Sequence, residues 1–366
     1  MIHIERIDTL AEFASLREEW NDLLAASGSE SIHLRHEWLY TWAVHFLAKK
    51  DLLVLRLCEG NDTIGFAPLQ VRTIRLRGML PYRQVLFLGD PESDFSDFIV
   101  ARHREQALRA IFARLRSRLT WGEMLFHNIS DTSPNLYALK DILVRESAIV
   151  REQTKCYYID TQAVTWEQYY ATTSKSFVQQ DLRRLHNHLR DKNWEVVESP
   201  LTDIHREIET IYFLHHCSQT RKARSSYYAS DRYRRFIAAM MEELKRFGEI
   251  RLFYLLLDKK PIAFVLGFHF RKIFYYWNIG FDSAHQKLSP SKVLLAEVIQ
   301  RCFHSGVNEF NFMRGDSDYK TRWTKQFRSN FQIRWLNERG FYGFFNQYRS
   351  HSGQTSRAEQ PQLEPA

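Results

Sequence analysis

The stretch Phe281–Arg301, FDSAHQKLSPSKVLLAEVIQR, holds the junction between a strand and a helix. Ser289 can be the N-cap of that helix, and Pro290 stands at its first position, where a missing N–H leaves no helical hydrogen bond unmade. The first turn contains Lys292 and no acid, although the helix macrodipole favours Asp or Glu there by about 0.3–1 kcal/mol. A bound anion reverses that preference, so this helix start predicts a phosphate site. An ordinary capped helix with a solvated lysine is the alternative.

Three strand signals precede this helix in close succession. They span Ile250–Leu257, Ile262–Phe270 and Ile273–Phe281, and short polar segments between them have the composition of tight turns. The middle strand, IAFVLGFHF, is apolar on both faces, as expected at the centre of a sheet that is covered on both sides. The sequence therefore predicts a meander of strands that leads directly into the helix at Pro290.

A second segment, Asn311–Trp323 (NFMRGDSDYKTRW), ends a predicted strand in a charged turn. Gly315 permits a sharp change of direction or a close approach of the backbone to a ligand. Ligands bind at such carboxyl ends of strands in open α/β sheets, which makes this turn a candidate binding site. The alternative is a helix cap with an exposed cluster of charged side chains. The polar residues after the strand are Arg314, Asp316, Asp318, Tyr319, Lys320 and Arg322.

The remaining signals divide the chain into two α/β halves. At 366 residues the chain exceeds what one hydrophobic core usually serves. We expect domains at 1–152 and 153–340 and a disordered polar tail at 350–366, because the tail has no apolar periodicity.

Each half has its own order of expected elements. In the first half we expect strands at Ile2–Ile4, Leu52–Leu57, Ile64–Val71, Val85–Leu88, Phe95–Val100 and Met124–Phe126. We also expect three helices there: one at Leu10–Leu24, one that begins after Ser31 as its N-cap, and one at Arg104–Leu119. In the second half, besides the segments above, we expect helices at Ser174–Arg190, Ile204–Cys217, Tyr233–Phe247 and Pro290–Ser305, with strands at Trp194–Glu198, Asn308–Met313 and Gln332–Leu336.

Composition and charge narrow the classes of function. The net charge of +8 favours anionic partners, but the basic residues are dispersed among 43 acids, so we expect no specific nucleic-acid partner. An association with a membrane surface or a polysaccharide-synthesis complex stays open. The sequence shows no signal-peptide pattern and no 18 consecutive apolar residues, which predicts a cytoplasmic protein.

The motifs of several common enzyme classes do not occur. The four cysteines form no CxxC pair and have no histidine at ligand spacing, so we expect buried thiols and no metal. GxSxG, Walker, HExxH and GxGxxG patterns are likewise missing from the sequence, which argues against the commonest hydrolases, NTPases and dehydrogenases.

The two segments together resemble the CelD/BcsL-type acetyltransferases of the GNAT superfamily. The pattern runs from strand, hairpin and strand through GFD and an SP-initiated helix to a glycine, a strand and RGDxxYKxxW. These are bacterial proteins often associated with cellulose or exopolysaccharide production, and they are similar to the Fem-type peptidoglycan aminoacyl transferases with paired GNAT domains. The resemblance covers residues 155–336 most closely, and Ala67–Leu69 and Ser93–Asp97 also look like this family.

This resemblance implies a fold, a reaction and a cofactor. The fold class is mixed α/β (α+β), with tandem GNAT-like domains, each a mostly antiparallel sheet flanked by helices. The reaction is acyl transfer, with acetyl-CoA or another acyl-CoA as substrate, to the amine of a small molecule such as an amino sugar. The CoA pyrophosphate would be held by Gln286, Ser289, Ser291 and Lys292, in a loop that matches the GNAT Gln/Arg-x-x-Gly-x-Gly/Ala signature with serine at both glycine positions.

Roles for the neighbouring polar residues follow from that reaction. Asp282 can act as the base that deprotonates the acceptor, Tyr319 can protonate the leaving thiolate, and Lys320 resembles the family's YK lysine, which could neutralise phosphate or oxyanion charge. Arg314 and Asp316 are candidates for substrate binding. Two alternatives remain: a noncatalytic GNAT-fold scaffold of a polysaccharide-secretion system, and a Fem-like aminoacyl transferase, although no long coiled-coil insertion is present.

Overall fold

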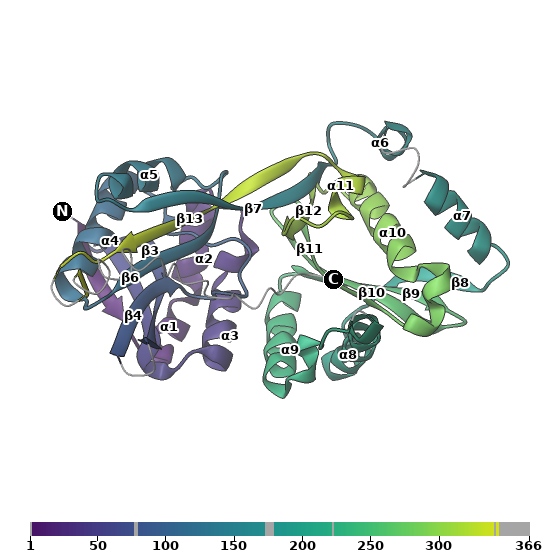
Figure 1. Ribbon diagram of the computed structural model, residues 1–366, viewed down its shortest axis with the longest axis horizontal. Coiled ribbons are helices and arrows are strands. Elements are labelled where there is room, and N and C mark those ends of the chain that lie inside the picture. The colour runs from purple at the N-terminus through teal and green to yellow at the C-terminus, as the bar shows by residue number, and fades with distance from the viewer. Residues whose placement is uncertain (1, 77–79, 173–178, 222, 340–341, 344–366) are drawn as a thin grey trace. The chain divides into compact units, whose positions relative to one another are not determined.

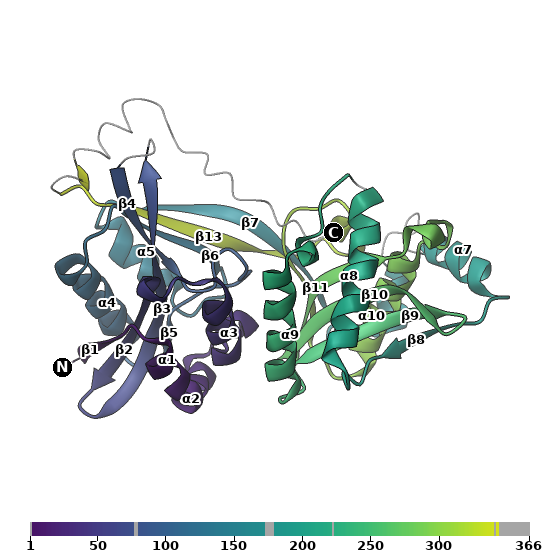
Figure 2. The ribbon, with the colours of Figure 1, turned by 90° about the horizontal axis from the view of Figure 1, so that it is seen from below.

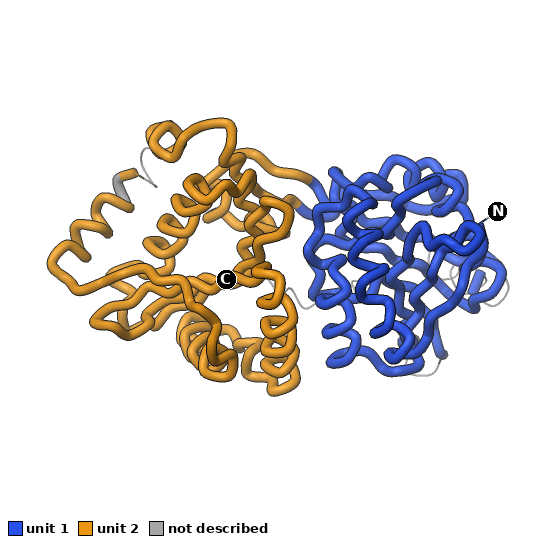
Figure 3. The backbone as a smooth tube through the Cα atoms, turned by 180° about the vertical axis from the view of Figure 1, so that it is seen from behind, with its two compact units in different colours: residues 1–154, 329–362 blue, residues 155–328, 363–366 orange. Residues whose placement is uncertain are grey.

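The computed structural model describes residues 2–76, 80–172, 179–221, 223–339 and 342–343, and these divide into two compact units (Figure 3). Of these described residues, those within 2–154 and 329–343 form unit 1, and those within 155–328 form unit 2. The helix expected to start at Ser174 has its first residues outside the described ranges, and so does the tail expected at 350–366. No helix in the described part of the chain combines the length and the apolar composition that a membrane crossing requires.

Unit 1 is built on a sheet in the order β1-β2-β3-β4-β6-β13, with β5 beside β3. Its strands are β1 (Ile2–Ile7), β2 (Leu52–Glu59), β3 (Asp62–Leu76), β4 (Leu80–Phe87), β5 (Ile99–Val100), β6 (Glu123–Ser130), the first part of β7 (Ile149–Asp160) and most of β13 (Phe327–Leu336). Its helices are α1 (Leu10–Ser15), α2 (Arg17–Ser27), η1 (Ile32–Leu34), α3 (His36–Phe46), η2 (Lys49–Asp51), α4 (Arg104–Arg118) and α5 (Leu136–Val144).

Unit 2 is built on a sheet in the order β7-β12-β11-β10-β9-β8. After the end of β7 its strands are β8 (Trp194–Glu198), β9 (Ile250–Leu257), β10 (Lys260–Phe270), β11 (Ile273–Phe281) and β12 (Glu309–Arg314). Its helices are α6 (Trp166–Thr172), α7 (Gln180–Leu189), α8 (Ile204–Arg221), η4 (Tyr227–Ala229), α9 (Asp231–Lys245), η5 (Ser283–Leu288), α10 (Pro290–His304) and α11 (Lys320–Trp323).

The two units repeat one arrangement, in which a helix connects two parallel strands of an otherwise antiparallel sheet. In unit 1, α4 lies between β4 and β6 in the chain, and in unit 2, α10 lies between β11 and β12. Other neighbouring strands within each unit, such as β2 with β3 and β10 with β11, run antiparallel. The expected fold class, mixed α/β with two similar sheet-and-helix domains, is confirmed.

Turn chemistry explains the meander of unit 2. Asp258 and Lys259 both have positive φ, as do Arg271 and Lys272, and each pair forms the two-residue turn of a hairpin. Positive φ at both central positions matches the right-handed twist of the flanking strands. The resulting sheet carries α8 and α9 on one side and α10 on the other (Figures 1 and 2). The middle strand β10 is therefore covered on both faces, as its apolar sequence predicts.

Several local predictions needed correction. The helix expected at Leu10–Leu24 is broken into α1 and α2 at Leu16. Ser31 caps the short helix η1, because its side chain accepts a hydrogen bond from the N–H of His33, and α3 begins later. The strand expected at Phe95–Val100 is only the two-residue β5. Helices α5 and α6 and strand β7 had no counterpart in the sequence-based expectation.

The largest difference concerns the last strand. The predicted domain range 153–340 assigns β13 to the C-terminal half, whereas Asn330–Leu336 pair with β6 of unit 1. Ile333 and Trp335 are buried in the core of unit 1, beside Phe126. Strand pairing joins segments that are far apart in the chain, so a division of the sequence into consecutive domains cannot show that β13 returns to the sheet of unit 1.

Candidate functional site

The loop from β11 to α10 forms the first part of the candidate site. Helix α10 begins at Pro290 as predicted, and its first turn contains Lys292 and no acidic residue. Ser289 occupies the N-cap position, but its side chain makes no capping hydrogen bond, so its predicted capping role is corrected. The reason lies in the backbone, because Ser289 adopts the left-handed conformation (φ 47°, ψ 53°) in place of the extended conformation of a capping serine.

This left-handed conformation bears on the two serines of the signature. Glycine is the residue that adopts positive φ without strain, and Ser289 stands where the GNAT signature has its first glycine. The chain therefore follows a glycine-like path here despite the serine, at a cost of about 1–2 kcal/mol. Ser291 lies inside the first turn of α10, where no such strain arises. Gln286, at the start of the signature, is exposed.

The ends of β11 and β12 form the second part of the site. Parallel pairing joins Ile273–Tyr275 to Glu309–Asn311, while β11 continues to Phe281. In the pairing of β11 with β10, Leu266 faces Asn278 and Gly267 faces Tyr276, so Trp277 is an extra residue that forms a β-bulge. Bulges re-aim side chains and are frequent beside active sites. The adjacent strands β11 and β12 therefore diverge at the edge of the sheet where α/β folds bind ligands.

The turn after β12 is held by Lys320. Its ammonium nitrogen lies 2.7 Å from the carbonyl oxygen of Arg314 and 3.3 Å from that of Met313, and the residue is fully buried. Gly315 has φ 111° and donates its N–H to the carbonyl of Lys155 at 3.0 Å. The lysine therefore stabilises the turn on which the neighbouring candidate residues stand.

The two acids proposed for the site each have a local partner. Asp282 is the N-cap of η5 and accepts a hydrogen bond from the N–H of Ala284 at 2.9 Å. Its carboxylate also lies 3.8 Å from Nε2 of His285. Asp316 accepts a hydrogen bond from the hydroxyl of Tyr157 at 2.7 Å. The pKa of Tyr157 is raised to about 12, mainly by burial and secondly by this neighbouring carboxylate. Tyr157 therefore stays a hydrogen-bond donor to Asp316 at neutral pH.

The topology gathers the predicted residues at one edge of the sheet of unit 2. Asp282 and the segment 286–292 follow β11, and the segment 314–320 follows β12. Because β11 and β12 are parallel neighbours, their carboxyl ends lie at the same edge. The structure thus brings the two motifs of the sequence to one edge, as their resemblance to a joint motif implies.

Four buried polar atoms near this edge were not anticipated from the sequence. They have no hydrogen-bond partner among the described residues, and they are the hydroxyl oxygens of Tyr228, Tyr276 and Tyr319 and the side-chain oxygen of Asn278. The amide nitrogen of Asn278 donates to the hydroxyl of Tyr227. An asparagine inside the apolar strand IFYYWNIGF was the available signal, because a buried amide needs partners.

Burial keeps the phenols of this region protonated. It raises the pKa of Tyr276 well above its ordinary value, and it raises the pKa of Tyr319 as well. In both cases burial is the largest cause, because a buried phenolate loses its hydration. Tyr319 therefore carries a proton at neutral pH, as a proton donor to a leaving thiolate requires.

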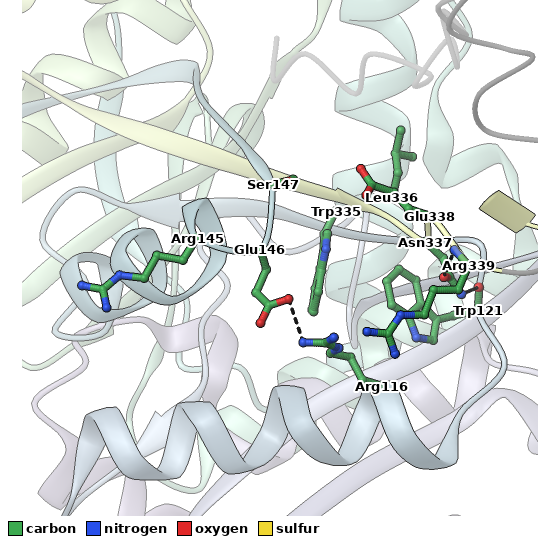
Figure 4. A pocket seen from close by; sticks show the side chains of 10 residues that line it. All are labelled: Arg116, Trp121, Arg145, Glu146, Ser147, Trp335, Leu336, Asn337, Glu338 and Arg339. Carbon is green, nitrogen blue, oxygen red and sulfur yellow. Dashed lines mark hydrogen bonds and ion pairs between the residues drawn. The ribbon is translucent and has the colours of Figure 1, made fainter.

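A pocket of about 320 Å³ lies elsewhere, in unit 1 (Figure 4). It is lined in part by Arg116, Trp121, Glu146, Trp335 and Asn337. Arg116 is paired with Glu146 at 2.7 Å, and Asn337 donates to the carbonyl of Trp121 at 2.8 Å. Among the described residues that line the pocket, no buried polar atom is without a hydrogen-bond partner. The pocket is therefore a weaker candidate for a ligand-binding site than the edge of the sheet in unit 2.

Among the residues that the structure describes, one group of side chains could hold a metal ion. Pairing of β1 with β2 sets His3 opposite Cys58, and the ligand atoms of His3, Glu5 and Cys58 lie within 4.8 Å of one another. Imidazole, carboxylate and thiolate are all ligands of zinc. The sequence-based expectation of no metal did not consider this group, because strand register alone brings these residues together.

Comparison with known proteins identifies the fold around the candidate site. A family model described as "Acetyltransferase (GNAT) domain" matches residues 176–321, which include the first motif and all but the last two residues of the second. This part of the chain is therefore similar to the acetyltransferase domains of the GNAT superfamily. The chain has no match among the curated proteins.

Solved structures share the fold of the chain at low sequence identity. FemX aligns with a TM-score of 0.62 and 10% identity over 94% of this chain and 99% of FemX. A conserved protein from Bacteroides thetaiotaomicron aligns with a TM-score of 0.56 and 14% identity over 92% and 100% of the two chains. L-PGS from Bacillus licheniformis aligns with a TM-score of 0.53 and 10% identity over 91% and 96%. These likenesses concern the fold of both units.

Proposed function

We propose that the protein is an acyl-CoA-dependent N-acyltransferase that transfers an acyl group, acetyl in the simplest case, to the amine of a sugar, an amino acid or a related metabolite. Its biological setting in this proposal is the production of exopolysaccharide or cellulose, as for the CelD/BcsL-type acetyltransferases. The similarity of residues 176–321 to GNAT acetyltransferase domains supports an acyl donor of the CoA type.

The start of α10 carries the proposal. Its positively polarised end has Lys292 in the first turn, no acid, and a glycine-like backbone at Ser289. An anion at this end satisfies the N–H groups of the first turn and the macrodipole together. Gln286, Ser289, Ser291 and Lys292 would then hold the pyrophosphate of CoA.

The residues beyond β11 and β12 would act on the reacting groups. Asp282 is proposed as the base for the acceptor amine and Tyr319 as the proton donor to the thiolate, while Arg314 and Asp316 would contact the acceptor. Lys320 is proposed to act on phosphate or oxyanion charge through the turn that it holds. Correct placement of the two reactants can itself contribute roughly 7–11 kcal/mol to lowering the barrier.

Thermal unfolding with acetyl-CoA tests the donor site. A ligand that binds only the folded protein raises its free energy of unfolding by about 2.7 kcal/mol at 100 times its Kd. We expect acetyl-CoA to raise the Tm, and Lys292→Glu or Ser291→Glu to abolish the shift. Lys272→Glu is the matched control, because this exposed lysine lies in the turn at the other end of β11. No shift of the wild-type Tm at millimolar acetyl-CoA would contradict the proposal and favour a noncatalytic scaffold.

An aminoacyl donor is the alternative that the fold suggests. FemX and L-PGS are among the similar structures, and the chain covers nearly the whole of each. A Fem-like transferase would bind aminoacyl-tRNA, with an affinity that falls steeply with salt. Tight, salt-sensitive tRNA binding together with an unchanged Tm in acetyl-CoA would support this alternative over the first proposal.

A further inference from the structure

His3, Glu5 and Cys58 lie on one face of the sheet of unit 1. The pairing of β1 with β2 sets His3 directly opposite Cys58, and Glu5 follows two residues later in β1. Successive side chains of a strand point to opposite faces. Leu57 belongs to the hydrophobic core of unit 1 and Ile4 packs against it, so the three polar side chains beside them point away from that core. Strand register therefore gathers an imidazole, a carboxylate and a thiol.

The three ligand atoms lie close to the spacing that one zinc ion requires. Nε2 of His3 is 3.5 Å from Oε1 of Glu5, and one ligand atom of each of the three residues lies within 4.8 Å of the other two. Tetrahedral zinc, with its usual bond lengths, sets nitrogen and oxygen about 3.3 Å apart and sulfur about 3.6 Å from each. The imidazole and the carboxylate thus already have this spacing, and the thiol needs to come closer by about 1 Å at most.

The exposure of the three side chains allows that adjustment. The side chains of His3 and Glu5 are 52% and 47% exposed, so they can rotate at little cost in packing and an ion can reach them from solvent. Cys58 is only 4% exposed, which fixes the position of its sulfur. Two movable ligands can therefore close on one that is held in place.

Neighbouring charges complete the group. Oε2 of Glu5 lies 3.5 Å from Nη1 of Arg56, so one oxygen of this carboxylate faces His3 and the other faces a cation. Carboxylates that bind metal ions are themselves held by a further hydrogen-bonding partner. Nη2 of Arg56 lies 2.7 Å from Oε1 of Glu19, which offsets the positive charge of the guanidinium. With the thiol ionised, three negative groups face one positive group, and a divalent cation balances the difference.

We propose that His3, Glu5 and Cys58 bind a zinc ion that fastens β1 to β2, with water as the fourth ligand. Imidazole, carboxylate and thiolate together suit zinc, whereas magnesium and calcium take oxygen ligands. Binding forms the bond from sulfur to zinc, displaces water from the ion and releases the thiol proton to solvent. The site lies in unit 1 and does not depend on the proposed acyl transfer.

The place of β1 in the sheet gives the ion a structural role. β1 is the first strand in the order of the sheet, with β2 as its neighbour, and the burial of its own side chains is at most partial. A bond across this pair at His3 and Cys58 therefore adds to a weakly held end of the sheet. We expect zinc to raise the Tm of the protein, because it binds the folded strand pair.

Calorimetric titration of the full chain with zinc chloride tests the site. The protein is reduced and stripped with EDTA beforehand, and we expect it to bind one zinc ion per chain at micromolar concentration. Loss of a ligand should cost at least the 10-fold in affinity that loss of an outer partner typically costs, so His3→Gln and Cys58→Ser should weaken binding by about 10-fold or more.

Matched substitutions in unit 2 are the controls. His205→Gln changes an exposed histidine and Cys217→Ser changes a half-buried cysteine, and both should leave zinc binding unchanged. His3→Gln alters an exposed side chain, so it keeps the test valid even if Cys58→Ser does not fold. Cobalt(II) provides an independent measurement, because a thiolate ligand gives a sulfur-to-cobalt absorption band that Cys58→Ser should abolish.

Hydrogen exchange tests whether the ion fastens the strand. Zinc should slow amide exchange in β1 and leave exchange unchanged in β8, the last strand in the order of unit 2. No binding at micromolar zinc would overturn the proposal, as would wild-type affinity in both His3→Gln and Cys58→Ser, since the ion would then sit elsewhere. Zinc that binds through these residues without slowing exchange in β1 would overturn the structural role of the ion.

Discussion

The ammonium nitrogen of Lys320 lies 2.7 Å from the carbonyl oxygen of Arg314, in a turn where the lysine side chain is fully buried. A buried charge of this kind persists only where polar partners replace its hydration. The main-chain carbonyls at the end of β12 supply that replacement, so the lysine sets the path of the chain that carries Asp316 and Tyr319. A residue proposed to act on substrate charge thus has a definite structural role as well.

Replacement of Lys320 by Met tests this role. We expect Lys320→Met to lower the free energy of unfolding by about 1–3 kcal/mol, because the carbonyl oxygens of Met313 and Arg314 lose a buried donor. Urea unfolding measures the change, and Lys325→Met, at an exposed lysine of the same unit, is the control. Wild-type stability combined with a lost response to acetyl-CoA would instead indicate direct contact of Lys320 with the cofactor.

The two serines of the phosphate loop should respond to glycine in opposite directions. Ser289→Gly removes the strain of a left-handed serine, so we expect the free energy of unfolding to rise by up to about 1 kcal/mol. Ser291→Gly places glycine in the first turn of α10 and should lower it by about 0.5 kcal/mol. Thermal unfolding of both variants measures the pair, and a destabilised Ser289→Gly would contradict the conformation described for the loop.

Asp97 should make the stability of unit 1 depend on pH. Burial raises the pKa of this carboxyl group to about 6, although Ser133, Asn135 and the N–H of Phe98 donate hydrogen bonds to it. The unfolded chain releases this proton near pH 4, so the stabilisation is complete below that pH and is lost as pH rises through about 6.

The variant Asp97→Asn isolates this contribution. An amide can keep the hydrogen bonds to Phe98 and Asn135 on its oxygen and donate to Ser133, but it does not titrate. We expect the wild type to lose stability relative to Asp97→Asn between pH 4 and 7, by an amount on the order of 3 kcal/mol. Urea unfolding at a series of pH values measures the difference, and parallel curves for the two proteins would refute the prediction.

Strand β13, which returns to unit 1 from the far end of the chain, should contribute strongly to the stability of that unit. Ile333 is fully buried in its core, so Ile333→Ala is expected to cost about 2–5 kcal/mol through lost contacts and a cavity. Hydrogen exchange should then accelerate in β6, the partner of β13, although β6 lies far earlier in the chain. The control Val144→Ala, at a half-exposed position of the same unit, should change little. Unchanged exchange in β6 would show that β13 contributes little to this core.

Several elements of unit 2 have the bounds that the sequence predicts. The strands β8, β9 and β11 have the predicted bounds, because apolar runs and turn residues mark both ends of each. Pro290 marks the start of α10, since its fixed φ and missing N–H suit that position. The family suggested by the two motifs is the superfamily matched at residues 176–321. That the side chain of Ser289 makes no capping hydrogen bond was not predictable in the same way, because φ at that residue depends on the path of the whole loop.

The sequence by itself determined the bounds of several local elements and showed which two segments resemble the GNAT superfamily, because turn preferences, caps and apolar periodicity act over a few residues. Tertiary structure alone decided that β13 joins β6 and that Lys320 donates to the end of β12. The physical reason is that periodicity marks which side chains are buried, whereas the meeting of buried polar atoms depends on strand register, bulges and crossovers between distant segments.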